Sequence, residues 1–148
     1  MPIKQYPFKS LDPVSPARPY LPVVLRNPHN SSAKYQSWGL IDTGADNTVI
    51  PGNLARIIGH DLNKGKPRSV LTAGGIATNY EHAFEIDILK IDKNGNVGND
   101  VQLTIPSQQI AVSPGLHVIL LGVHDFLGQY ILSIDYPKQT FSISAPTK

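Results

Sequence analysis

Short runs of apolar residues, separated by Gly, Pro and Asn, dominate the chain and predict strands rather than helices. The clearest alternation lies in residues 82–91, where Phe84, Ile86 and Ile88 occupy every second position. A continuous apolar run at 116–122 is typical of a strand buried on both faces. Further strands are expected at 20–28, 35–41, 47–51, 101–105 and 109–112, with hairpins about Gly74–Gly75 and about 137–139. The pattern therefore predicts an all-β fold.

Helical signals are few. Residues 52–60 predict one short helix, with Asn53 as its N-cap and Gly59 as its stop, and residues 123–129 predict a helical turn. Pro22 lacks an N–H for a sheet ladder, so the first strand of the domain is expected at an edge. Residues 1–19 hold five Pro, which predicts an extended arm or a disordered leader before a folded domain at 20–148.

Composition narrows the function classes. A chain of 148 residues is the length of one ordinary domain, and its 13 Pro and 12 Gly suit turn-rich β-structure. The absence of Cys excludes disulfides, thiol catalysis and Cys-based zinc sites. No stretch has the length of a membrane span and the N-terminus has no apolar signal-peptide core. A soluble, cytoplasmic protein that binds no membrane is expected.

The weaker chemical signals have simpler explanations. Lys64, Lys66 and Arg68 lie in a Gly/Pro-punctuated loop without aromatic neighbours, and the formal net charge is only +2, so we expect a solvated loop and no nucleic-acid partner. The segment "DKNGNVG" begins like a calcium loop, but Val97 and Leu103 replace residues that such a loop requires. The five His residues show no metal-ligand spacing. We therefore predict no metal and no cofactor.

The segment "WGLIDTGADNTVI", residues 38–50, carries the main chemical signal. Leu40 and Ile41 lead directly into Asp42, and an apolar strand resumes at Thr48. A carboxylate that enters a buried sheet has to be stabilised or neutralised. The small residues Gly44 and Ala45 let the backbone pack closely around such a carboxyl group. A polar hairpin turn is the simple alternative for an isolated Asp-Thr-Gly triplet.

This segment resembles the signature of the retroviral-type aspartic proteases, the retropepsins, and "LIDTGADNTVI" matches that pattern nearly throughout. Their second signature is an apolar strand that ends in Gly and is followed by a short helix, and "VILLGVHDFLGQYILSIDY" is similar to it. Gly74 and Gly75 stand where the flap tip of the family would lie. The resemblance covers roughly residues 20–145 and implies a closed-barrel-like β fold with one or two short helices.

The resemblance also implies an aspartic endopeptidase that hydrolyses peptide bonds with a water activated by two carboxyls. The chain holds one Asp-Thr-Gly triplet, so the second Asp42 would come from a second copy in a homodimer. Asp42, Thr43 and Gly44 would be catalytic, with Thr43 bonding across the dimer. The substrate-binding residues would be Ala45, Asp46, Asn47, Gly74 and Gly75. Gly122 would lie under the active-site loop and be structural.

One departure from the family pattern concerns the residue after Gly122. Retroviral members have an Arg after the glycine of the second signature, which pairs with the Asp of the "GAD" run, whereas Val123 follows Gly122 here. The partner of Asp46 is therefore absent or comes from elsewhere, with Arg26 as a candidate. Two alternatives stay open: a catalytically silent retropepsin-fold module for peptide binding or dimerisation, and a β-sandwich with a chance Asp-Thr-Gly turn.

Overall fold

The computed structural model describes residues 3–147. The strands in chain order are β1 (Ile3–Pro7), β2 (Tyr20–Asn27), β3 (Asn30–Ile41), β4 (Val49–Pro51), β5 (Lys66–Thr72), β6 (Gly75–Ile91), β7 (Val97–Ser113), β8 (Ile119–Leu121), β9 (Ile131–Asp135) and β10 (Thr140–Ser144). The helical segments are α1 (Gly52–Ile57) and the single 3-10 turns η1 (Leu62–Lys64) and η2 (Leu127–Gln129). The predicted all-β class is confirmed.

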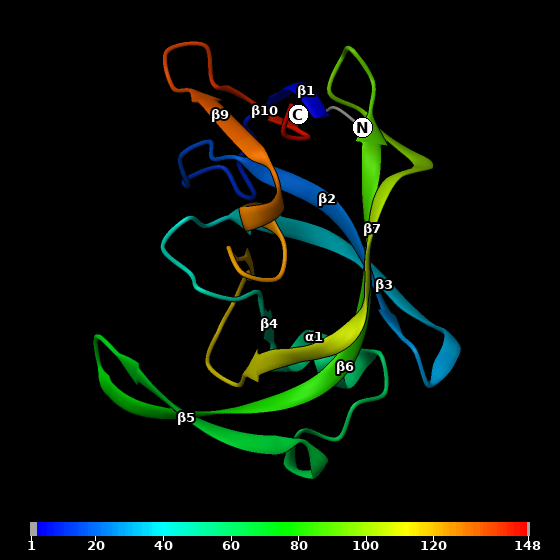
Figure 1. The fold of residues 1–148 in the computed structure, drawn as a ribbon, viewed down its shortest axis with the longest axis vertical. Helices are drawn as coiled ribbons and strands as arrows, with labels where there is room; N and C mark the ends of the chain where they lie inside the picture. The colour runs from blue at the N-terminus through cyan, green and yellow to red at the C-terminus, as the bar shows by residue number, and fades with distance from the viewer. Residues whose placement is uncertain (1–2, 148) are drawn as a thin grey trace.

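The larger sheet closes on itself. Its strand order is β2-β3-β8-β4-β7-β6-β5. Because β2 also pairs with β6, all strands of this sheet except β5 form a ring (Figure 1). β5 lies outside the ring and pairs only with β6, which makes a long hairpin. The six strands of the ring each have two neighbours, whereas a β-sandwich consists of two open sheets packed face to face. The β-sandwich alternative is therefore wrong.

Residues at every second position of the barrel strands fill its interior. On β6, Phe84, Ile86 and Ile88 are each 0% exposed, as their alternation predicts. α1 adds Leu54 and Ala55 to the same core. The other fully buried Leu, Ile and Phe side chains of the core are Ile3, Leu21, Leu25, Ile50, Ile58, Ile119, Leu121, Phe126, Phe141 and Ile143.

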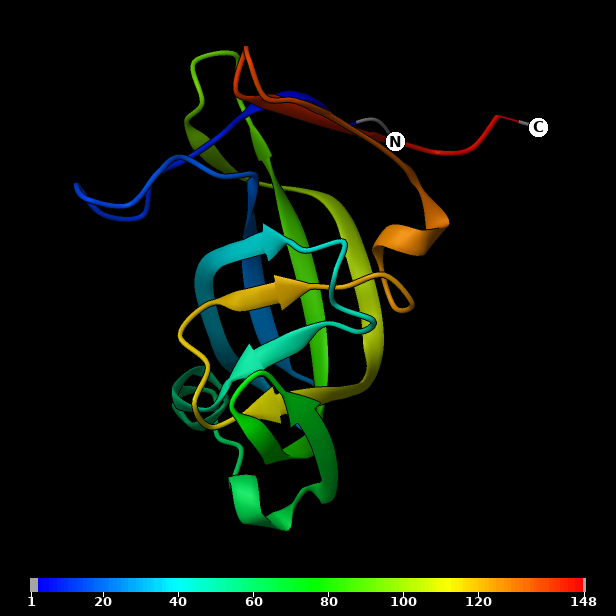
Figure 2. The same cartoon turned by 90° about the vertical axis from the view of Figure 1, so that its left-hand side faces the viewer.

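A second sheet joins the two ends of the chain at one end of the barrel. Its order is β1-β10-β9, and β1 and β10 lie side by side in both ribbon views (Figures 1 and 2). Tyr6 of β1 is buried, and its ring meets the Phe141 ring edge-on with the two centroids 6.0 Å apart. Its hydroxyl oxygen accepts a hydrogen bond from the Ile91 N–H at 3.2 Å. The Pro-rich N-terminal segment is thus anchored to the barrel through β1.

Three local expectations were wrong. β2 is not an edge strand, because it pairs with both β3 and β6; Pro22 lies just before the pairing with β6 starts at Val23. Asn53 is not the N-cap of α1, because the helix begins at Gly52 after Pro51, and its side chain accepts only the Leu54 N–H. The two strands expected at 101–105 and 109–112 are one strand, β7, with a register irregularity at Pro106, where no ladder bond is required.

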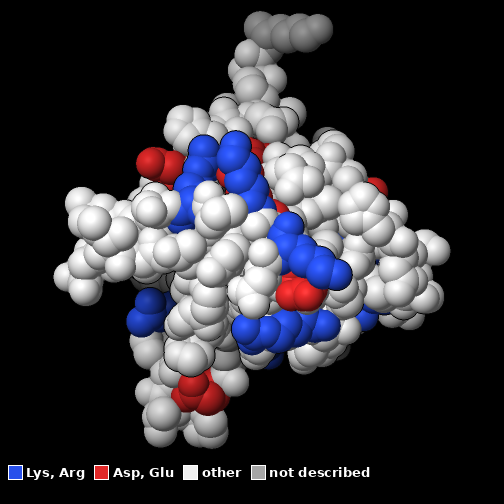
Figure 3. All heavy atoms as spheres, turned by 90° about the horizontal axis from the view of Figure 1, so that it is seen from below, with Lys and Arg blue, Asp and Glu red and all other residues white. Residues whose placement is uncertain are grey.

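The charged side chains of the barrel are mixed in sign. Figure 3 shows Lys and Arg side chains gathered on the face seen from below, with acidic side chains beside several of them. Lys66 and Arg68 lie in β5, so the expectation of a loop there is wrong, and Arg68 forms an ion pair with Glu81 of β6 at 3.0 Å. No helix in the described part of the chain is long and apolar enough to cross a membrane.

Candidate active site

Asp42 follows the last residue of β3, where β3 runs parallel to β8 in the barrel wall. Its N–H donates to the Leu121 carbonyl at 3.1 Å, which continues the β3–β8 ladder by one bond. The chain then turns tightly: the Gly44 N–H donates to Asp42 Oδ1 at 3.0 Å and the Ala45 N–H donates to the Asp42 carbonyl at 3.2 Å. The carboxylate is half-buried, and the barrel edge and this turn fix its position.

The Asp42 loop, residues 42–48, is hydrogen-bonded to the segment that follows β8. The Val123 N–H donates to the Ala45 carbonyl at 3.0 Å, and the His124 N–H donates to the Asp46 carbonyl at 2.7 Å. Asp125 accepts the Thr48 N–H at 2.9 Å and the Thr48 hydroxyl at 2.9 Å. Two segments about eighty residues apart in the sequence therefore form one rigid unit at the end of β3.

Gly122 lies directly against the Asp42 loop. A Cβ atom added there would stand 2.7 Å from Asn47 Cα and closer still to the Asn47 carbonyl group, so no side chain fits without moving backbone. The Gly122 N–H donates to the Thr48 hydroxyl at 3.1 Å. This close approach agrees with the supporting position that the sequence suggests for Gly122.

Arg26 does not pair with Asp46, and the suggestion that it supplies the missing partner is wrong. Its Nε donates to Asp87 on β6 at 2.7 Å. In the described part of the chain Asp46 takes part in no ion pair, and it is exposed. The contact made instead is the backbone bond from His124 to the Asp46 carbonyl.

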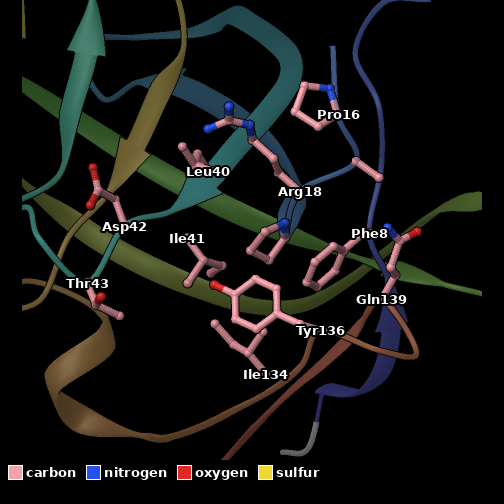
Figure 4. A pocket seen from close by; sticks show the side chains of 12 residues that line it. Phe8, Pro16, Arg18, Leu40, Ile41, Asp42, Thr43, Ile134, Tyr136 and Gln139 are labelled. Carbon is pink, nitrogen blue, oxygen red and sulfur yellow. The ribbon is translucent and has the colours of Figure 1, made fainter.

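A cavity of about 560 Å³ opens beside Asp42 and Thr43 (Figure 4). One wall is the N-terminal segment, with Phe8 and residues 16–19, and the other is the β9–β10 hairpin, with Ile134 and Tyr136. Ala45, Asp46, Asn47, Gly74 and Gly75 do not line this cavity. The carboxylate of Asp42 thus stands at the rim of a hollow with a mixed polar and apolar lining, to which both ends of the chain contribute.

The β5–β6 hairpin projects on the same side of the barrel as the Asp42 loop (Figure 1). Its turn is at Ala73–Gly74, and Gly75, with φ +114°, begins β6. The side chains of Leu71 and Ile76 face each other in register near the tip and are 86% and 80% exposed. We call residues 66–81 the flap hairpin. An exposed apolar pair at a hairpin tip is suited to covering another chain.

Two His rings lie at the base of the flap hairpin. The ring centroids of His60 and of His82 on β6 are 4.8 Å apart, and the ring Nε2 atoms lie 2.8 Å from the Ala83 carbonyl and 3.1 Å from the Leu62 carbonyl respectively. Burial, and then the neighbouring His82, lower the pKa of His60 below its usual value of 6.5. The described residues contain no group of three or more His, Asp or Glu placed to hold a metal ion.

Sequence reasoning missed Asp125 as part of this unit. No Thr-Gly follows Asp125 in "VHDF", so the sequence indicates no catalytic triplet there, yet its carboxylate binds the loop that carries Asp42. For Thr48 the sequence pattern predicts only the start of a strand. A polar residue that is 1% exposed needs partners, and that signal appears only once burial is known.

A closed β-barrel with an Asp-Thr-Gly loop at a strand end and a projecting hairpin beside it defines a retropepsin-like architecture. The model of the aspartyl protease family matches residues 33–124 of this chain. A solved retropepsin-like aspartic protease from Rickettsia conorii has the same fold, with a TM-score of 0.53 and 22% identity over 83% of this chain and 87% of that chain. No curated protein matches the sequence. The chain belongs to the aspartyl protease family, as the sequence resemblance predicted.

Proposed function

We propose that this protein is an aspartic endopeptidase whose active site forms between two copies of the chain. The observation that carries the proposal is the hydrogen bonding of the Asp42 carboxylate, which leaves one of its oxygens without a donor. Oδ1 accepts the Gly44 N–H at 3.0 Å, and within residues 3–147 no donor engages Oδ2. A half-buried carboxylate with one free oxygen, at the rim of a cavity, can share a proton with a second carboxylate brought up to it.

Two such carboxylates provide both an acid and a base. Like charges about 3 Å apart cannot both ionise, so the pair keeps one proton between them, as in aspartic proteases generally. The ionised member would take a proton from a bound water as that water attacks the scissile carbonyl carbon. The protonated member would donate to the carbonyl oxygen. The member that took the water's proton would then pass it to the peptide nitrogen as the C–N bond breaks, and a hydroxyl of the intermediate would return a proton to the other member. One chain supplies one Asp-Thr-Gly triplet, so the second would belong to a homodimer partner.

The remaining residues take supporting roles in this proposal. Thr43 is exposed at the tip of the Asp42 loop, where its hydroxyl can bond to the partner's loop. Gly44 supplies the N–H that holds Asp42 Oδ1. Ala45, Asp46 and Asn47 would border the substrate, and Asp46 and Asn47 are exposed on the loop. Gly74 and Gly75 would shape the flap hairpin so that it closes over the peptide and excludes water.

Digestion of a random peptide pool, followed by mass spectrometry, tests the proposal. Wild-type protein should cut the pool, Asp42→Asn should not, and the control Asp61→Asn, at an exposed carboxylate outside the site, should cut like wild type. Pepstatin-type inhibitors should block the wild-type reaction. If wild type forms dimers that retain peptides without cutting them, the chain is a silent binding or dimerisation module. If Asp42→Asn cuts normally, the proposal is wrong.

A further inference from the structure

A second hollow, distinct from the cavity at Asp42, lies on the outer wall of the barrel. It has a volume of about 370 Å³ and crosses four neighbouring strands in the order β3, β2, β6 and β7. The residues that line it are Lys34 and Gln36 from β3, Val24 and Arg26 from β2, Asp87 and Leu89 from β6, and Asn99 and Val101 from β7. We call it the outer pocket.

The outer pocket lies far from the proposed catalytic centre. Lys34 and Asp42 are eight positions apart along β3 and its end, which corresponds to roughly 26 Å of extended strand. Its lining side chains point away from the barrel core, because the alternating positions Val23 and Leu25 of β2 are the ones buried inside. Neither Asp42 nor the flap hairpin contributes to it.

A buried carboxylate fixes the orientation of one cationic side chain in the pocket. Asp87 has a side chain that is 6% exposed, and it accepts Arg26 Nε at 2.7 Å and the Thr104 hydroxyl at 2.7 Å. Both carboxylate oxygens are therefore engaged, so Asp87 is not a free ligand for a cation. Arg26 is 35% exposed on its side chain, and its terminal nitrogens form no hydrogen bond among the described residues. The guanidinium is held in place with its outer donors unused.

Further unused donors surround the guanidinium. Lys34 stands directly opposite Arg26 in the β2–β3 register, and no carboxylate of residues 3–147 pairs with it. Asp87 balances the charge of Arg26, so Lys34 brings a positive charge to the lining that no described carboxylate balances by an ion pair. Glu85 is in register with Arg26 on its other side but forms no ion pair with it in the described chain. Gln36 and Asn99 also have side-chain amides without a partner in the described structure.

The floor of the pocket is apolar. Leu89 is 4% exposed, Val24 is half-buried, and Val101 is 43% exposed. A ligand that suits this lining has one anionic group for Arg26 and Lys34 and a small aliphatic group for the floor. Its size falls at the small end of pockets that bind small molecules.

We propose that the outer pocket binds a carboxylate attached to an aliphatic group, as in a peptide or acylated amino acid that ends in Leu, Ile or Val. Arg26 and Lys34 hold the carboxylate through charge-assisted hydrogen bonds. Gln36 and Asn99 bind the amide that precedes it, and the aliphatic side chain covers Val24, Leu89 and Val101. The site is a second recognition site on the barrel, and it does not depend on the proposed catalysis.

Chemical-shift titration of the full-length ¹⁵N-labelled protein tests this assignment. N-acetyl-leucine should shift the amide signals of residues 24–26, 34–36 and 99–101 and leave those of the Asp42 loop unmoved. The neutral analogue N-acetyl-leucinamide should not bind there. A decapeptide ending in Leu is the second arm: tighter binding than N-acetyl-leucine indicates a chain terminus as the natural ligand, and equal binding indicates a free acyl amino acid.

Variants separate this site from the proposed active site. Lys34→Gln, at an exposed position, should raise the Kd by about three- to tenfold, the loss expected for one charge-assisted contact. The control Lys66→Gln on β5 should leave the Kd unchanged. Asp42→Asn should bind as wild type does, whether or not the protein is a protease. Equal binding of acid and amide, shifts confined to other regions, or an unchanged Kd in Lys34→Gln would each overturn the proposal.

Discussion

Replacing Asp125 tests whether the segment after β8 holds the Asp42 loop in place. In Asp125→Ala, the Thr48 N–H and hydroxyl both lose a charged acceptor, and Thr48 itself is 1% exposed, so its two donors depend on that acceptor. Hydrogen bonds to charged groups contribute about 1.5–3 kcal/mol each in such settings. Asp125 is only half-buried, so we take the low end and expect a loss of about 3 kcal/mol for the two donors.

This loss should lower the unfolding temperature by about 6–12 °C for a domain of this size. Asp125→Asn keeps one acceptor oxygen without the charge and should cost less, about 1 kcal/mol. Peptidase activity should fall in the same order, because the loop that carries Asp42 loses its support. Stability is to be measured by urea and thermal unfolding at one fixed protein concentration, since a dimer's stability depends on concentration.

The control for Asp125→Ala is Asp100→Ala, at an exposed carboxylate on β7 that accepts no hydrogen bond within residues 3–147. It should unfold within about 0.5 kcal/mol of wild type, as surface substitutions do. If Asp125→Ala unfolds at the same urea concentration as this control, the bonds to Thr48 do not support the loop and the reasoning fails.

Three further outcomes are expected. Gly122→Ala should be poorly folded or inactive by circular dichroism and peptidase assay, because its Cβ would overlap the backbone of the Asp42 loop. Gly75→Val should lower kcat with little change in the urea midpoint, since a β-branched residue resists φ +114° at an exposed tip, whereas Gly74→Ala should be active. The pKa of His60 is lower in the folded protein than its unfolded value near 6.5, so unfolding takes up protons. The free energy of unfolding should therefore fall as the pH drops from 7 through that value. In pH-dependent unfolding, His60→Gln should make this dependence weaker, and the control His117→Gln should not.

The sequence was informative where one local pattern decided the structure. Successive side chains of a strand point to opposite faces, so the alternation predicts that Phe84, Ile86 and Ile88 share one buried face. Each of these side chains is buried as expected. The small residues after Asp42 predicted a tight turn around a carboxyl, and the Gly44 N–H does bind Asp42 Oδ1. Both features depend on residues within a few positions of one another.

The features that sequence reasoning missed depend on contacts between distant segments. Pro22 predicted an edge, but closure of the barrel gives β2 a second neighbour, and no local signal reports the pairing of Val23 with Ile88. The sequence suggested Arg26 as the ion-pair partner of Asp46, whereas the pairing of β2 with β6 brings Arg26 to Asp87. Asp125 supports the Asp42 loop from about eighty residues away. Such pairings follow from sheet order, which a single sequence does not specify.

Mixing wild-type chains with Asp42→Asn chains tests the central claim most directly, because each protomer is proposed to give half of the acid pair. After subunit exchange has been verified, about a ninefold excess of Asp42→Asn should lower the activity per wild-type chain to about one tenth, by random pairing and mass action. Dilution of wild type alone should likewise lower its specific activity as dimers separate. Activity that is unchanged by the excess of exchanged Asp42→Asn chains, or that persists in a monomer by sedimentation, would contradict a site shared between two subunits.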